Sequence, residues 1–217
     1  KYQLNYQEVT KQQVLDILED IDNQYLVTEY INMCDELKAV YDGAVNTVRM
    51  IVFKKDGKNP QIGNAYVRFG SKKTGAVDNV GAGGMTATID VATGHFHDAK
   101  IVMNNSIEDC PIHPDTGVPI DGYLPHWEQV KQQVLDVTKS IKQLEFFGVD
   151  LAVTNDGIKF PEINRFPDYP AVEKYTKPTR EYLLYKLAGK KHHYGYDVTP
   201  NKTLVHLPKR DSERGKS

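Results

Sequence analysis

One short turn restricts the fold of this chain more than any other feature. Asn155-Asp156-Gly157 is a strong hairpin signal, because these residue types tolerate the backbone conformations of a tight turn. Two strand candidates flank the turn, Gly148 to Val153 and Ile158 to Ile163. With Asp156 at the centre of the hairpin, Asp150 and Glu162 are equally far from the turn. We therefore expect these two acids to face each other across the strands.

The expected pairing has a chemical consequence. Opposed β-carbons lie about 4.5–5.5 Å apart in an antiparallel pair, so the two carboxylates repel unless a cation or a proton separates them. Strand alternation puts Asn164 on the face of Glu162, opposite Gly148, where we expect open space. Mg²⁺ prefers such oxygen ligands and usually adds substrate phosphates. The spacing fits a magnesium-nucleotide site, and it fits equally well a hairpin whose acids point into solvent.

Upstream of the hairpin, the patterns indicate one helix and then a sheet. Apolar residues at helical spacing follow Thr10 as far as Ile21, and Thr10 can cap the first turn. Runs rich in β-branched and aromatic residues come next, separated by glycine-containing turns. We expect these runs to form a meander of antiparallel strands, at Tyr25 to Ile31, Val45 to Phe53, Gln61 to Phe69, Thr86 to Val91 and Gly94 to Val102.

The remaining segments complete an α+β prediction, an antiparallel sheet with flanking helices. Four prolines between Ile107 and Pro125 predict a loop, and an apolar stripe from Trp127 to Phe146 predicts a helix that leads into the hairpin. A last helix is expected from Pro178 to Leu187. We expect one catalytic domain over residues 1–190 and a basic, loosely ordered tail over residues 191–217.

Composition narrows the class of protein. With 27 Lys and Arg against 29 Asp and Glu, the formal net charge is -2, so no overall basic field favours nucleic acid or an anionic membrane. Cys34 and Cys110 form no disulfide framework, and we expect both to be inert. No apolar run approaches the length of a membrane helix, so we expect a cytoplasmic protein. Because the chain opens at Lys1, we also expect a processed product, a trimmed version or a fragment of a longer protein.

Several motifs carry a resemblance to a known family. Val149-Asp150-Leu151-Ala152 and Phe160-Pro161-Glu162-Ile163-Asn164-Arg165-Phe166-Pro167 look like the closing hairpin of ATP-grasp ligases. Four upstream motifs make the resemblance specific to the sugar-transfer-associated branch, which is linked to exopolysaccharide and capsule synthesis. They are Val45-Asn46-Thr47-Val48-Arg49, Val67-Arg68-Phe69-Gly70, Val77-Asp78-Asn79-Val80 with Gly83-Gly84, and His113-Pro114-Asp115-Thr116-Gly117. The chain thus resembles the C-terminal catalytic part of an ATP-grasp protein, from Gln24 to Pro167.

The resemblance implies ATP and two magnesium ions as cofactors. In the family, the residues equivalent to Asp150 and Glu162 bind one ion, and those equivalent to Glu162 and Asn164 bind the second. Arg49 and Arg68 are implied to face the γ-phosphate and the acceptor, as guanidinium groups that grip anions. The alternative for both arginines is a surface position next to ordinary acidic partners.

Other residues are implied to bind the nucleotide or the acceptor. Asp78-Asn79 and Gly83-Gly84 match a segment whose backbone approaches the phosphates or the acceptor, although glycines also mark ordinary turns. Glu29 lies in the family's hinge strand and is implied to meet the adenine edge; an exposed strand glutamate is the alternative. Glu36 is a more speculative contact to the ribose. The histidines and cysteines show no zinc-site spacing.

Together these residues predict an ATP-dependent ligase that activates a carboxylate as an acyl phosphate. Its partners are then a small-molecule or sugar-linked carboxylate and an acceptor nucleophile. A noncatalytic module that binds a glycan or a protein is one alternative, and phosphoryl transfer to a sugar hydroxyl is another. ATP-grasp proteins normally carry an earlier subdomain with a glycine-rich loop and lysines over the phosphates, and we expect this subdomain to be missing from residues 1–217. We therefore expect residues 1–217 alone to bind ATP weakly.

Overall fold

The computed structural model describes residues 2–4, 7–21, 28–54, 58–103, 106–165, 167 and 180. The chain divides into two compact units, residues 1–30 and residues 31–217. The predicted tail lies outside the described residues, as does the predicted helix from Pro178 to Leu187 apart from Arg180. The single domain over residues 1–190 stays a prediction.

The first unit contains a small sheet and one helix. Strands β1 (Tyr2–Leu4) and β2 (Gln7–Val9) pair antiparallel, and α1 (Lys11–Asp20) follows. Thr10 caps α1 as predicted: its hydroxyl accepts from the Gln13 backbone N–H at 3.2 Å, and the Gln13 side chain accepts from the Thr10 N–H at 2.8 Å. This reciprocal pair satisfies two N–H groups that the first helical turn leaves without intrahelical partners.

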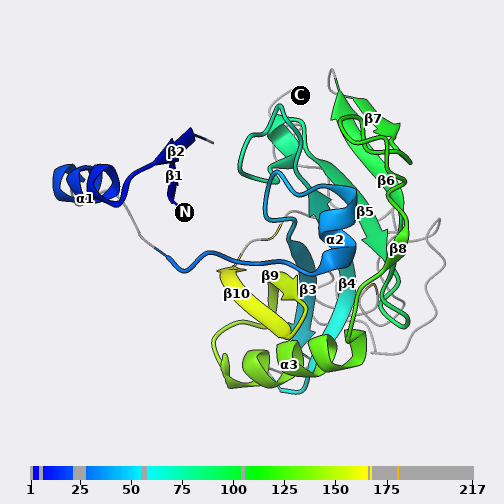
Figure 1. Ribbon diagram of the computed structural model, residues 1–217. Helices are drawn as coiled ribbons and strands as arrows, with labels where there is room; N and C mark the ends of the chain where they lie inside the picture. Colours follow the sequence, from blue (N-terminus) through cyan, green and yellow to red (C-terminus); the bar gives the residue numbers. More distant parts are fainter. Residues whose placement is uncertain are drawn as a thin grey trace, which may run out of the picture. The chain divides into compact units, whose positions relative to one another are not determined.

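The second unit is built on an antiparallel sheet that has eight strands among the described residues (Figure 1). The strand order is β10-β9-β3-β4-β5-β6-β7, and β8 also pairs with β6. This arrangement confirms the predicted meander and the α+β class. The strands are β3 (Val48–Lys54), β4 (Pro60–Phe69), β5 (Met85–Ile89), β6 (His95–Met103), β7 (Ser106–Asp109), β8 (Gly122–Tyr123), β9 (Phe146–Thr154) and β10 (Gly157–Asn164).

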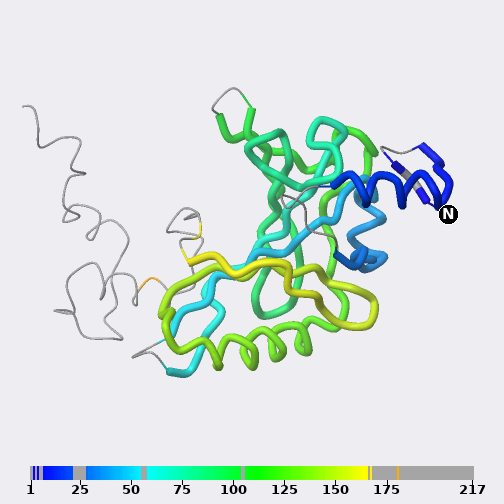
Figure 2. Tube along the Cα trace, turned by 90° about the vertical axis from the view of Figure 1, so that its left-hand side faces the viewer, coloured from blue at the N-terminus to red at the C-terminus, as the bar shows by residue number. Residues whose placement is uncertain are grey.

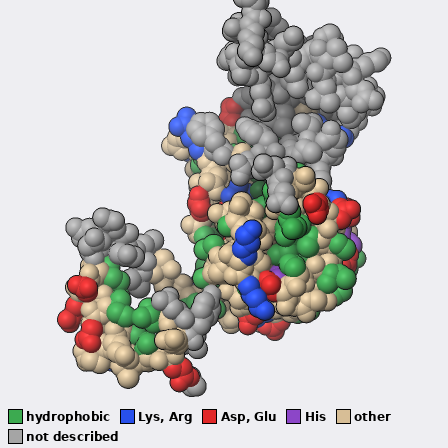
Figure 3. Space-filling view, turned by 90° about the horizontal axis from the view of Figure 1, so that it is seen from above, with side chains coloured by type: hydrophobic (Ala, Val, Ile, Leu, Met, Phe, Trp, Pro, Cys, Tyr) green, Lys and Arg blue, Asp and Glu red, His purple; other side chains and the backbone are tan. Residues whose placement is uncertain are grey.

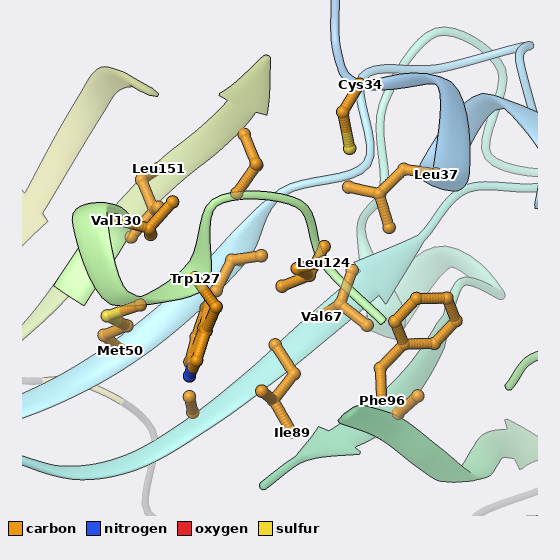
Figure 4. Packing of buried hydrophobic residues seen from close by; sticks show 14 of the residues in the cluster. Cys34, Leu37, Met50, Val67, Ile89, Phe96, Leu124, Trp127, Val130 and Leu151 are labelled. Carbon is orange, nitrogen blue, oxygen red and sulfur yellow. The ribbon is translucent and has the colours of Figure 1, made fainter. Parts of the chain in front are cut away.

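The main hydrophobic core lies on one face of this sheet. Side chains alternate between faces along a strand, so Val48, Met50 and Val52 of β3 enter the core while Arg49 points to the opposite face. Two helices, α2 (Asp35–Val40) and α3 (Trp127–Ser140), cover this face and add buried side chains to the core. Figure 4 shows side chains from both helices packed with strand residues, including Leu37, Val130, Val67 and Leu151.

The two helices have different roles in this packing. In the ribbon of Figure 1 and in the Cα trace of Figure 2, α3 lies alongside the β9–β10 hairpin. Helix α2 follows Cys34, whose backbone N–H donates to the Val153 carbonyl at 2.7 Å and ties the helix to β9. Burial raises the pKa of the Cys34 thiol to about 11, so the thiol stays protonated at neutral pH.

Helix α3 ends earlier than predicted, at Ser140 instead of Phe146. Phe146 begins β9 and pairs with Phe53 of β3, which requires an extended backbone. The buried Lys54 side chain donates to the Ile141 carbonyl just after the helix. A cation there interacts favourably with the negative end of the helix. The tertiary pairing of β9 therefore ends the helix, although the apolar stripe continues.

Two further expectations are corrected. The strand predicted from Tyr25 to Ile31 is absent from its described part, residues 28–31, since residues 28–30 are exposed and β-propensity alone does not form a strand. The loop predicted between Ile107 and Pro125 is partly regular, because its two ends belong to β7 and β8 and pair with β6.

The surface of the second unit has a mixed character. On the face seen in Figure 3, hydrophobic, basic and acidic side chains are interspersed. In the part of the chain that the structure describes, no helix is long and apolar enough to cross a membrane.

Replacing Gly94 with alanine tests the packing under α3. Gly94 has φ of 79°, and an added Cβ would lie 2.6 Å from Cγ of Trp127. We expect the free energy of unfolding to fall by about 2–5 kcal/mol, from left-handed backbone strain plus overpacking. Gly75→Ala is the matched control, because Gly75 has φ of 68° and no atom within 4 Å of the added carbon. Urea denaturation followed by circular dichroism should show a smaller loss there; equal losses would contradict this packing.

Candidate functional site

The β9–β10 hairpin places the predicted acids as expected. Glu162 pairs with Asp150, and Asn164 pairs with Gly148. A β-bulge between Lys159 and Glu162 shifts the register just before these pairs. The space opposite Asn164 is not open, however, since a Cβ at Gly148 would lie 2.8 Å from Pro167 Cβ and 3.0 Å from Arg49 Cδ. Gly148 thus makes room for the side chain of Arg49.

Asp150 is the centre of a buried ion-pair network. Its Oδ1 accepts from Arg49 Nε, and its Oδ2 accepts from Arg49 Nη2 at 2.8 Å and from Arg68 Nη2 at 3.0 Å. Asp150 is 4% exposed and Arg49 6%. The expected repulsion between Asp150 and Glu162 is therefore offset in this structure by guanidinium groups, which satisfy the buried carboxylate.

The network continues from Arg68 to Asp78. Arg68 Nε donates to the Thr47 hydroxyl at 3.0 Å and lies 3.4 Å from Asp78 Oδ2. The Thr47 backbone N–H and hydroxyl both donate to the same Asp78 oxygen. Arg68 thus contacts two carboxylates that are far apart in the sequence, those of Asp78 and Asp150. Thr47 was not among the predicted residues, although it lies two positions from Arg49 on the same strand segment.

These side chains line a cavity of about 770 Å³ within the second unit. The cavity lies on the sheet face opposite the main core, since its lining residues alternate with core residues along β3, β4 and β5. Seven of the ten predicted site residues line it: Arg49, Arg68, Asp78, Asn79, Asp150, Glu162 and Asn164. The sheet therefore gathers most of the predicted site into one pocket.

Comparison with known proteins identifies the family. The family model described as sugar-transfer associated ATP-grasp matches residues 7–171. The chain belongs to the sugar-transfer associated ATP-grasp family. Searches of curated proteins and of solved structures found no match. Membership assigns ATP binding and an ATP-dependent, ligase-like function in the context of sugar transfer.

In this ATP-grasp protein, the predicted glycines shape a loop. Gly83 has φ of 107°, and a Cβ at Gly84 would lie 2.9 Å from the backbone oxygens of Asn79 and Phe69. The Asn79 side chain accepts from the Gly81 N–H at 2.9 Å and caps the short 3₁₀ helix η2 (Val80–Ala82). Gly83 and Gly84 do not line the cavity. The left-handed backbone favours glycine at Gly83, and close backbone contacts require it at Gly84. The contact of either glycine with a ligand stays a prediction.

The predicted adenine and ribose contacts are not among the residues that line this cavity. Glu29 is exposed and belongs to the first unit, and its role stays a prediction. Glu36 is exposed in the first turn of α2 and does not line the cavity.

The histidine of the loop motif supports the loops around the site. His113 is fully buried and stacks on Tyr41 with ring centroids 4.7 Å apart. Its Nε2 lies 2.9 Å from the Gly70 carbonyl, and its Nδ1 accepts from the Asp115 N–H at 3.2 Å. Asp115 in turn accepts from the Lys72 N–H at 2.7 Å. These contacts attach the loop motif to the segment that leads to Asp78.

The sequence reasoning missed the part of the cavity beyond the arginines. Strands β4, β5 and β6 contribute polar side chains there: Asn64, Tyr66, Thr86, Thr88, Asp98 and Lys100. Except at Asp98, their alternation with core residues along each strand is a signal that could have identified them. They lacked a recognised motif, so only the topology brings them to the site.

The donor set fits magnesium with one condition. Among the described residues, no three His, Cys, Asp or Glu side chains form a group able to hold an ion. Glu162 and Asn164 can supply two oxygen ligands, and Mg²⁺ usually takes the remainder from phosphates and water. The carboxylate of Asp150 already binds the guanidinium groups of Arg49 and Arg68. It can become a metal ligand only if another anion binds those guanidinium groups in its place.

Two substitutions compare how the buried carboxylate of Asp150 and the exposed carboxylate of Glu162 affect stability. Asp150→Asn should lower the free energy of unfolding by about 3–5 kcal/mol, because it leaves Arg49 buried without its counter-charge. Glu162→Gln, at an exposed position across the hairpin, should change it by less than about 0.5 kcal/mol. Urea titrations of both variants measure the difference. Similar stabilities would show that the ion pair does not hold the sheet.

Proposed function

We propose that this protein is a Mg²⁺- and ATP-dependent ligase that activates a carboxylate as an acyl phosphate. The observation that carries the proposal is the joint position of Arg49, Arg68, Asp150 and Glu162 on one cavity of an ATP-grasp domain. We further propose a role in exopolysaccharide, capsule or cell-envelope synthesis, supported by the sugar-transfer association of the family. Its use of ATP and its free cysteines support a cytoplasmic location.

The residues would act mainly by positioning charge. A carboxylate oxygen of the substrate attacks the γ-phosphorus of ATP, the bond to the β-phosphate bridging oxygen breaks, and ADP leaves. The acceptor nucleophile then attacks the acyl carbon, loses its proton, and displaces phosphate. Arg49 and Arg68 would hold the transferred phosphoryl group, since guanidiniums form paired hydrogen bonds with phosphate oxygens.

The acids and the amide would hold the nucleotide's metal. Glu162 and Asn164, with Asp150 behind them, would bind Mg²⁺, which neutralises charge on the β- and γ-phosphates. Asp150 also fixes the orientation of both guanidiniums before substrate binds, through the bonds at 2.8 Å and 3.0 Å to Oδ2. Such prior orientation lowers the reorganisation needed in the transition state.

Turnover by the Glu162→Gln variant tests the ligase proposal. We expect ADP release by the full-length protein, assayed with a panel of carboxylates and amines, to fall at least about 100-fold. Asp136→Asn on the exposed face of α3 is the matched control and should change the rate by less than about twofold.

The products of this assay distinguish the candidate functions. An amide or ester together with ADP supports the ligase. A phosphosugar instead selects phosphoryl transfer to a hydroxyl, and no turnover with any substrate selects the noncatalytic module. An unchanged rate in Glu162→Gln would remove Glu162 from the mechanism.

Metal binding should depend on the nucleotide. Because Asp150 is neutralised by two arginines, Mn²⁺ used as a probe for Mg²⁺ should bind at least about tenfold more tightly with ADP than without it. Water proton relaxation measures the bound fraction without any turnover. Glu162→Gln should weaken the ADP-dependent binding. Equally tight binding of Mn²⁺ without ADP would show that the acids form a complete metal site on their own.

A further inference from the structure

A row of polar side chains continues the site across the sheet. The register pairs Asp150 with Arg49, Arg49 with Tyr66, and Tyr66 with Thr88. In the adjacent row Arg68 pairs with Thr86. The cavity that begins at the hairpin acids is therefore lined, over β4 and β5, by hydroxyl groups that both donate and accept hydrogen bonds.

The charges that line the cavity give it no excess positive charge, either as a whole or in its far half, the part over β5 and β6. The cavity's three basic residues are Arg49, Arg68 and Lys100, against four acids, so the formal sum is 3 − 4 = −1. Each of the three is in an ion pair: the arginines with Asp150, and Lys100 with Asp109 beside the cavity. An anionic group over β5 and β6 would have to compete with these carboxylates.

A bulge in β6 adds a carboxylate to this half. His97 pairs with Thr88 on the cavity face, and the next buried residue is Ala99, so Asp98 is an extra residue in the strand. Its φ of 51° is unusual for a residue with a side chain. The bulge turns Asp98 toward the cavity, and His97 Nδ1 lies 3.1 Å from its Oδ2. Bulges of this kind commonly re-aim a side chain next to a functional site.

Strand spacing gives the size of the space between the arginines and Asp98. β4 and β6 are two strands apart, which is about 10 Å at the usual spacing. The arginines occupy the end toward the hairpin. Hydroxyl groups, the carboxylate of Asp98, the ion-paired Lys100 and two apolar residues, Val102 and Ile107, line the remainder. That length and lining match a single ring that carries several hydroxyl groups.

We propose that the cavity over β4, β5 and β6 is an acceptor subsite for a hydroxyl-rich ring of the sugar type that is neutral or carries an amine. Tyr66, Thr86 and Thr88 hydrogen-bond its hydroxyls, and Asp98 accepts from a hydroxyl or an ammonium group. The subsite discriminates against an acidic ring, because binding it would bring carboxylates together. The proposal rests on the proposed function, in which the arginine end of the cavity holds the reacting phosphoryl group.

Three sugars that differ in one charged group test the subsite. Glucosamine, glucose and glucuronate are titrated into the full-length protein with and without Mg-ADP, and binding is measured by ligand-observed NMR. We expect glucosamine to bind most tightly and glucuronate at least about tenfold more weakly than glucosamine, as charge-assisted bonds and like-charge repulsion require. Asp98→Asn should reduce the preference for glucosamine over glucose at least about threefold, with the fold checked by circular dichroism.

Asp136→Asn is the matched control for the loss of one carboxylate and should leave the order of affinities unchanged. Any of three results overturns the proposal. They are glucuronate that binds as tightly as glucosamine, an Asp98→Asn variant that keeps the preference for glucosamine, and no binding of any of the three sugars. The test is separable from the ligase assay. If the sugars bind in the expected order of affinities but no ADP is released, the subsite is supported and the ligase proposal is rejected. If ADP is released but the sugars do not bind in that order, the ligase is supported and the subsite is rejected.

Discussion

The buried carboxylate of Asp150 is the interaction on which the rest of the site depends. It lies on β9, its partners Arg49 and Arg68 lie on β3 and β4, and the three strands are neighbours in the sheet. A buried charge is tolerated only with such partners. The strand order that brings the arginines to Asp150 is therefore also the one that builds the site. Through Thr47 the network also fixes Asp78, and with it the start of the glycine loop.

The same strands serve the core and the site on opposite faces. Met50 and Val67 pack under α2 and α3, while their sequence neighbours Arg49 and Arg68 line the cavity. The rigid packed face holds the polar face in position, so side chains from separate strands can form one site, which loop residues such as Asp78 and Asn79 complete. Asp98 is the exception, because a bulge and not regular alternation turns it toward the cavity.

Local patterns in the sequence predicted most of the strands and helices. The exact strand register and the partners of the site residues depend on long-range pairing. The turn at Asn155-Asp156-Gly157 correctly predicted that Asp150 faces Glu162, but for an incomplete reason. The pairs next to the turn, such as Gly157 with Thr154, are offset by one residue from that expectation, and the bulge before Glu162 restores it. The bulge includes Pro161, which has no N–H to donate to a ladder. The pairing of Asp150 with Arg49, 101 residues away, has no local signal, so the sequence suggested a metal where the structure has guanidiniums.

In the proposed function, the shared use of Asp150 would link phosphate binding to metal binding. An anion that enters the cavity competes with Asp150 for Arg49 and Arg68, and each guanidinium bond that it takes returns a lone pair to the carboxylate. A metal next to Glu162 gains a ligand by the same exchange. Such coupling is reciprocal, so a bound metal must raise the affinity for phosphate by the same factor as bound phosphate raises the affinity for the metal. By this proposal the site would respond to phosphate and metal together. The contacts of Arg68 with Thr47 and Asp78 would hold its guanidinium during the exchange.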